Sequence, residues 1–194
     1  MISPLLHAHI TQFIEIDEIE MQFIDSILIS RPFKQGEIIV RSGEPARYLA
    51  YNNSGYTVTY LTDEKGIDHV IRFSAAGWWT GDLYSLSEDS FTRLTTKALC
   101  DGELLILPRS AQNQLLSTYP KFERYFRLLF QTALMRQQVR FVESHSLPAK
   151  ERYIKFQKSF PGIEQFLPQK YVASYLGITP EFLSKIRKQL LSKK

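Results

Sequence analysis

Apolar and polar positions follow a helical period at the two ends of the chain and a strand period between them. In residues 3–29, isoleucine and phenylalanine recur at steps of three and four and acidic residues crowd the outer side, which predicts one or two helices. From Arg31 to about Leu107, short β-branched and aromatic runs alternate with glycine-containing turns. The runs are EIIV, YLAYNN, YTVTYL, HVIRF, TRLTTKAL and ELLIL. Many short strands at near-regular spacing predict an antiparallel barrel or roll.

The run YTVTYL at residues 56–61 has the clearest strand alternation. Tyrosine or valine occupies positions 56, 58 and 60, and threonine or leucine occupies positions 57, 59 and 61. This alternation predicts a half-buried strand, with one face toward the core and one toward solvent.

A long helix is predicted from Pro120 to about Ser146. One row of positions follows the alternating steps of a two-helix coiled coil: Tyr125, Leu128, Thr132, Met135, Val139 and Val142. A second apolar row lies on the neighbouring face: Phe122, Phe126, Leu129 and Ala133. One row is enough to dock the helix on the roll, so two rows predict that it also packs on a second copy of the chain. The alternative is an ordinary buried helix of a monomer.

After Pro148 a further helix, AKERYIKFQKSF, is predicted, and two short helices around a sharp turn are predicted between Gln169 and Leu191. Gly177 can end the first of the two, Thr179 can cap the second, and Pro180 suits its first position. The facing apolar stripes are Val172, Ala173 and Leu176 on one helix and Leu183, Ile186 and Leu190 on the other. This is the layout of a helix-turn-helix, whose second helix enters the major groove of DNA.

The outward face of the second helix carries the polar side chains. Glu181, Ser184, Lys185 and Lys188 share one side, Arg187 flanks them, and Lys193 and Lys194 follow. A glutamate can accept a hydrogen bond from cytosine and a lysine can donate to guanine. The candidate DNA-contacting residues are Gln169, Thr179, Glu181, Ser184, Lys185, Arg187 and Lys188. The alternative is a solvated helix hairpin with a basic end.

Charge separates the chain into an acidic body and a basic C-terminal part. Residues 1–120 hold 9 basic and 15 acidic residues, whereas residues 121–194 hold 15 basic and 5 acidic residues, so only the latter part is expected to meet a polyanion. The single cysteine, Cys100, excludes an internal disulfide and a cysteine-based cluster. No signal-peptide pattern or membrane-spanning stretch is present, so we expect a cytoplasmic protein with no membrane contact.

The stretch GWWTGDLYSLSEDSFTRLTTKAL contains candidate ligand-binding chemistry. Backbone amides after Gly81 could form an anion cradle, Asp82 could accept from sugar hydroxyls, and Arg93 could pair with a phosphate. The alternative, which the residues alone favour, is a turn with a capping carboxylate and a surface arginine.

The order of roll, long helix and helix-turn-helix resembles the Crp/Fnr family of transcription regulators, and the resemblance covers nearly the whole chain. FKQGEIIVRSGEPARYLAYNNSGYTVTYL is similar to the first strands of the family's roll, GDL at residues 81–83 to its phosphate-binding turn, and ASYLGITPEFLSKIRK to its DNA-reading signature. The resemblance implies an α+β fold with an antiparallel β-roll (a double-stranded β-helix) and flanking helices. We expect three parts: a cyclic nucleotide-binding-like sensor at 1–118, a dimerisation helix at 119–147 and an all-α helix-turn-helix domain at 148–194.

The same resemblance implies function. A homodimer would read a pseudo-palindromic operator in double-stranded DNA and meet RNA polymerase, with Glu181 and Lys185 reading base edges and Thr179 touching a phosphate. The sequence stops at Lys194, so we expect a short form without the family's β-hairpin wing.

A small-molecule effector in the roll is also implied. Its candidate contacts are Gly81, Asp82, Leu83, Arg93, Thr95 and Thr132. A cyclic nucleotide of the cAMP type is one candidate, and another small molecule or no effector are the others. Two departures weigh against the nucleotide: Asp82 replaces the family's glutamate, and bulky Leu94 stands where a small hydroxyl residue follows the arginine.

Two other classes of function compete with a regulator. A cupin-like metalloenzyme needs several histidines on barrel strands, but only His69 lies in the strand block. His7 and His9 lie in a predicted helix and should point to different sides, so we expect no metal and no enzymatic activity. The last alternative is an interaction module without DNA affinity or effector.

Overall fold

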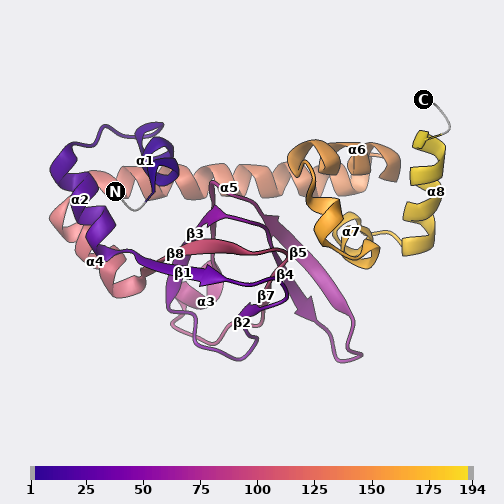
Figure 1. The fold of residues 1–194 in the computed structure, drawn as a ribbon, viewed down its shortest axis with the longest axis horizontal. Helices are drawn as coiled ribbons and strands as arrows, with labels where there is room; N and C mark the ends of the chain where they lie inside the picture. The colour runs from indigo at the N-terminus through magenta and orange to yellow at the C-terminus, as the bar shows by residue number, and fades with distance from the viewer. Residues whose placement is uncertain (1–2, 192–194) are drawn as a thin grey trace.

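The computed structural model describes residues 3–191, so Lys193 and Lys194 lie outside the described residues. The helices are α1 (Pro4–Thr11), α2 (Glu18–Ile27), α3 (Leu83–Ser87), α4 (Arg109–Thr118), α5 (Lys121–Ser146), α6 (Ala149–Ser159), a 3₁₀ turn (Ile163–Phe166), α7 (Gln169–Leu176) and α8 (Pro180–Leu191). The strands are β1 (Ile29–Phe33), β2 (Ile38–Val40), β3 (Tyr48–Ser54), β4 (Thr57–Thr62), β5 (Asp68–Ser74), β6 (Trp78–Thr80), β7 (Thr95–Ala98) and β8 (Gly102–Pro108). Figure 1 shows the roll in the middle, α1 and α2 at one end and α8 at the other.

In the described part of the chain the strands form two four-stranded antiparallel sheets, in the orders β1-β8-β3-β6 and β2-β7-β4-β5. The predicted α+β fold with an antiparallel roll is therefore confirmed. The strands β1 and β6 and the helix α4 were not predicted. β1 contains Pro32, which a strand tolerates at the edge of a sheet, and β1 is such an edge strand.

The strand β4 corrects the prediction of a half-buried strand. Residues 57–60 are all buried, because the C-terminal helices cover the face that would otherwise meet solvent. Tyr60 stacks on Tyr171 of α7 with ring centroids 5.9 Å apart, and Phe73 of β5 contacts Phe156 of α6 at 5.6 Å. The roll and the C-terminal helices thus share one hydrophobic core.

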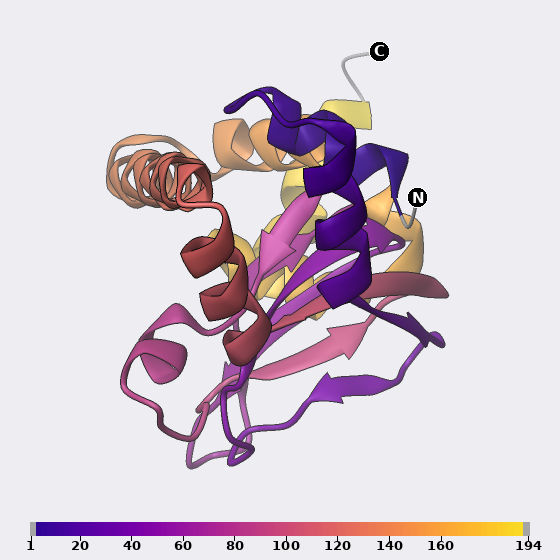
Figure 2. The same cartoon turned by 90° about the vertical axis from the view of Figure 1, so that its left-hand side faces the viewer.

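The long helix α5 changes character along its length. At its start Phe122 and Tyr125 are buried against the roll and the N-terminal helices, whereas Met135 and Val139 are each 57% exposed. Tyr125 therefore does not belong to a seam with a second copy: its hydroxyl accepts from Trp79 Nε1 at 2.7 Å and contacts His9 Nδ1 at 2.9 Å. Figure 2, in which α5 is seen nearly end-on, shows the helix at the side of the body.

The N-terminal segment forms two helices, one of the two options that its pattern allowed. Asp17 and Glu20 form a reciprocal capping box at the start of α2. The two histidines of α1 face different partners, as predicted: His7 bonds Asp25 and His9 contacts Tyr125. Between residues 3 and 191 no helix combines the length and hydrophobicity needed to cross a membrane.

Candidate nucleic-acid interface and roll cavity

The turn between α7 and α8 has the local chemistry that the sequence predicts. Gly177 adopts a φ of 65°, a left-handed conformation that glycine reaches without steric cost, and its amide donates to Ser174. The Thr179 hydroxyl accepts from the amide of Phe182 at 3.2 Å, which caps α8. The direction in which α8 leaves the turn is therefore set by adjacent residues.

Buried apolar side chains fix the packing of α8 on α7. Val172 and Leu183 are fully buried, and Ala173 and Ile186 are 1% and 2% exposed. This packing leaves the opposite side of α8 outward, where Glu181, Lys185 and Lys188 are exposed.

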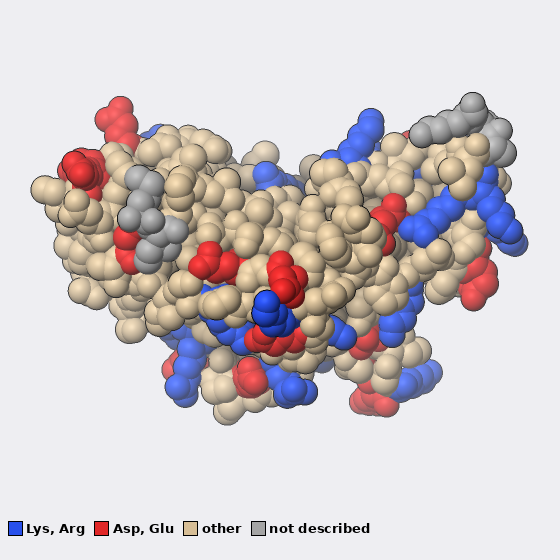
Figure 3. Space-filling view, in the orientation of Figure 1, with Lys and Arg blue, Asp and Glu red and all other residues tan. Residues whose placement is uncertain are grey.

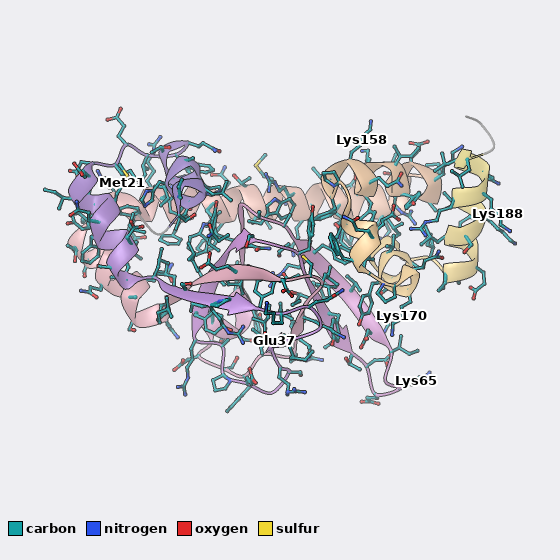
Figure 4. All side chains as sticks on the ribbon, in the orientation of Figure 1. Met21, Glu37, Lys65, Lys158, Lys170 and Lys188 are labelled. Carbon is teal, nitrogen blue, oxygen red and sulfur yellow. The ribbon has the colours of Figure 1, made fainter. Side chains whose placement is uncertain are left out.

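The outward face of α8 is charged and open. Figure 3 shows basic side chains gathered at this end of the molecule, and in Figure 4 Lys188 points away from the body. Hydrogen bonds from its own backbone amide and from Thr179 lower the pKa of Glu181, so its carboxylate is an acceptor at neutral pH. Ser184 is partly buried, and its hydroxyl donates to Gln169 Oε1 at 3.2 Å, which links the second turn of α8 to the start of α7.

Arg187 is placed differently from its prediction as a DNA contact. Its Nε donates to the Tyr153 hydroxyl at 2.9 Å, and its Nη2 forms an ion pair with Glu164. Burial alone would raise the pKa of Glu164, but hydrogen bonds from Gln157, Arg187 and Tyr153 bring it below its usual value. Arg187 therefore ties α8 to α6 and the 3₁₀ turn. No local pattern identified Glu164 or Tyr153 as its partners.

A second candidate site is a cavity of about 50 Å³ inside the roll. Its lining includes Tyr48, Thr59, Arg72, Thr80, Asp82 and Leu94. A water molecule needs about 10–15 Å³ of such space, so the cavity has room for a few small atoms. Sites for drug-sized ligands are larger, at about 300 Å³ or more.

Asp82 lines this cavity, but its carboxylate oxygens accept hydrogen bonds from residues of its own loop. It caps α3 by accepting from the Ser85 amide, and its Oδ2 accepts from Ser85 Oγ at 2.8 Å and Thr92 Oγ1 at 2.7 Å. Burial acts to raise the pKa of Asp82, but these hydrogen bonds and the charge of Arg72 lower it overall. A Cβ on Gly81 would lie 2.8 Å from Leu49 Cδ2, so a larger residue at position 81 would have to displace the Leu49 side chain.

Of the predicted effector residues, Gly81 and Asp82 line the cavity and the other four do not. Thr92 and Leu94 line it, whereas Arg93 between them is exposed, so Arg93 is not its cationic group. Leu83 is 41% exposed, and Thr95 accepts from the Ser42 amide. Thr132 lies on α5, away from the lining.

Arg72 of β5 is the arginine that sequence reasoning missed. It lines the cavity, and its Nη2 donates to the carbonyl of Gly81 at 2.6 Å. Its run, HVIRF, reads as an ordinary strand, and no motif marked the side chain as inward.

The described residues hold no group of three or more His, Cys, Asp or Glu side chains placed to bind a metal ion. His69, the histidine of the strand block, is exposed and bonds Asp63.

The chain is similar to known proteins in one domain and in its fold. Residues 30–119 match the family model of the cyclic nucleotide-binding domain. The electron transport regulator A of Shewanella oneidensis is 25% identical over 186 residues, covering 89% of this chain and 71% of that protein.

Solved structures with the same fold include FixK2 from Bradyrhizobium japonicum, with a TM-score of 0.72, 18% identity and 86% of each chain covered. A protein from Eubacterium rectale described as a transcriptional regulator of the Crp/Fnr family has a TM-score of 0.70 and 18% identity, with 98% of this chain and 87% of that chain covered.

Proposed function

We propose that this chain, which carries a cyclic nucleotide-binding domain and has the fold of Crp/Fnr transcription regulators, is a homodimeric protein that binds DNA through α8. The resemblance inferred from the sequence is thus confirmed for domain and fold. Two of the matched proteins are described as regulators, in agreement with the expectation that the chain is not an enzyme. The cytoplasmic location and the contact with RNA polymerase remain predictions, as does the division at residues 118 and 147.

The exposed face of α8 is the observation that carries the proposal. Glu181, Lys185 and Lys188 lie on the outer side of a capped helix whose inner side is buried on α7. Lysine and glutamate at these positions can donate to guanine and accept from cytosine in the major groove. Arg187 is left out of the proposed contacts because it is engaged with Glu164 and Tyr153.

The exposed half of α5 supports the homodimer. Large apolar side chains there are 57–68% exposed: Leu134, Met135, Val139, Phe141 and Val142. An apolar row of this length is typical of a protein interface, and the same row on a second copy would complete a two-fold contact. Two recognition helices would then meet half-sites about 34 Å apart.

Selection of bound sequences from random duplex DNA tests the proposal. The full chain should enrich two inverted half-sites whose centres are one helical turn apart, with an affinity that falls steeply as salt rises. Val139→Glu should yield a folded monomer in analytical ultracentrifugation and lose the paired half-sites. Glu151→Gln, at an exposed position of α6, serves as the control. Recovery of unrelated sequences by the wild type would contradict the proposal.

The cavity gives little support to a cyclic nucleotide as effector. Its volume is far below that of a nucleotide site, and the acceptor oxygens of Asp82 are already bonded within the loop. We therefore propose the regulator without assigning it a cyclic nucleotide.

A further inference from the structure

The strand β5 lies at the edge of its sheet, and a side chain of α7 takes the place of a neighbouring strand there. The half-buried hydroxyl of Ser174 accepts a hydrogen bond from the Val70 amide at 2.9 Å and donates to the Asp68 carbonyl at 3.1 Å. An edge strand normally offers these backbone groups to another strand. One serine therefore supplies both the acceptor and the donor that a paired strand would supply. Figure 1 shows α7 beside β5, with α8 beyond it.

A β-bulge in β5 extends the same contact to the long helix. Adjacent residues of β4 pair with Arg72 and Val70 of β5, so Ile71 between them is the extra residue of the bulge. The Ile71 carbonyl accepts a hydrogen bond from Arg140 Nη1 of α5. The Arg140 guanidinium carbon also lies 4.5 Å from the ring centroid of Tyr175 on α7. Helix α5, strand β5 and helix α7 therefore meet at this edge.

Apolar contacts hold α7 on the sheet, but hydrogen bonds fix its position along β5. Tyr171 stacks on Tyr60, and Val172 is fully buried in the core that the roll shares with the C-terminal helices. Apolar burial is non-directional, whereas a hydrogen bond requires particular atoms at a particular distance and angle. The Tyr171 hydroxyl donates to Asp68 Oδ2 over a longer 3.4 Å. Among the α7 side chains, Ser174 therefore makes the contacts that select one register on β5.

The register of α7 on β5 also determines where α8 lies. Ala173 of α7 and Leu183 of α8 belong to one buried cluster, so a shift of α7 along β5 would carry the outward face of α8 with it. In a two-fold dimer each recognition helix is placed by the roll of its own chain. The distance and angle between the two recognition helices would then depend on the contact between α7 and β5, and these quantities set the spacing of the half-sites.

We propose that Ser174 is a positioning residue for DNA recognition. Its two hydrogen bonds to the edge of β5 fix the orientation of α8 relative to the roll, and so select the spacing at which a dimer binds paired half-sites. Ser174 makes no DNA contact in this role. The inference rests on the proposed function, because it requires a dimer that reads two half-sites. Loss of the hydroxyl should broaden the range of tolerated spacings and leave the recognition of a single half-site unchanged.

Fluorescence anisotropy with a spacing series of duplexes tests the proposal. The half-sites selected by the full chain are placed at the preferred spacing and at spacings about two base pairs longer or shorter, which rotates one half-site by roughly 70° about the DNA axis. Ser174→Ala should reduce the wild-type preference for one spacing by roughly tenfold, because two hydrogen bonds no longer hold α7 in register. Ser174→Thr keeps the hydroxyl and should keep the preference. All these proteins should bind a duplex with a single half-site equally.

Controls separate positioning from a general loss of stability. Ser117→Ala on α4 is the matched control, because Ser117 is exposed and its hydroxyl bonds within its own helix. Circular dichroism checks folding, and Ser174→Cys, with a side chain of similar size and only a weak donor, is the second variant if Ser174→Ala does not fold.

Amide hydrogen exchange at Val70 tests the contact without DNA. The Val70 amide should exchange roughly tenfold faster in Ser174→Ala than in wild type and in Ser117→Ala, since its acceptor is removed. A wild type that binds no paired half-sites overturns the proposed function and this inference together. A wild-type spacing preference that Ser174→Ala retains, or an equal loss of affinity for paired and single half-sites, overturns this inference alone.

Discussion

The helix-turn-helix and the roll cavity both gather charged side chains, but the chain builds them in opposite ways. Residues 169–191 are contiguous, and Glu181, Lys185 and Lys188 face outward because the apolar stripe of α8 faces α7. The cavity is assembled from residues between Ile39 and Leu104 on separate strands and loops, and its charges are held inward by contacts with neighbouring segments. The first arrangement depends on local periodicity and the second on register, so their responses to substitution should differ.

The outward face of α8 should respond to substitution in DNA affinity and not in stability. Lys185→Ala is expected to weaken specific binding by about 1–3 kcal/mol, because it removes a donor to a base edge, while leaving the free energy of unfolding nearly unchanged. Binding of Lys185→Ala to selected and scrambled duplexes should be compared by fluorescence anisotropy. Lys158→Ala on α6 is the control for loss of one positive charge. An equal loss on both duplexes would mean that Lys185 contacts phosphate and reads no base.

The two regions also use glycine for different reasons, which a paired substitution can separate. Gly177→Ala should cost about 1–2 kcal/mol because an alanine is strained at positive φ, although its Cβ would have open space. Gly81→Ala should cost a similar amount because its Cβ would collide with Leu49. Urea denaturation measures both free energies of unfolding.

Asparagine at each position distinguishes strain from crowding. Gly177→Asn should recover much of the stability lost by Gly177→Ala, since asparagine tolerates the left-handed region, whereas Gly81→Asn should be worse than Gly81→Ala. The opposite order at position 177 would show that the turn is limited by space.

Prediction from sequence succeeds where the determining contacts lie within a few residues. The cap at Thr179 and the left-handed Gly177 follow from local chemistry, and both are present. The ion pair of Arg187 was not predicted, because its partner Glu164 lies 23 residues away, beyond any helical period.

The roll shows the same limit at longer range. Alternation in residues 56–61 predicted the strand, but not that C-terminal helices would cover its second face. Arg93 was predicted as an effector contact from its place in a motif, but its neighbours Thr92 and Leu94 line the cavity instead. The arginine of β5 that lines the cavity is Arg72. A local pattern does not predict which residues of distant segments meet at the cavity.

The ion pair that fixes α8 should give the smallest effect, in the response of stability to acid. The folded-state pKa of Glu164 lies below its unfolded value of about 4.3, so its contribution is fully present above that pH and is lost as pH falls through the folded pKa. Glu164→Gln should therefore reduce the free energy of unfolding by under about 1 kcal/mol at neutral pH, because the pair is partly exposed to solvent. The difference from wild type should shrink as pH falls below about 4.3, measured by urea denaturation between neutral and acidic pH. Glu151→Gln, at an exposed position of α6, is the control, with no expected change in stability in either pH range. A Glu164→Gln difference that grows in acid would mean that Glu164 is destabilised as a carboxylate in the folded state, and that Arg187 does not hold α8 through its charge.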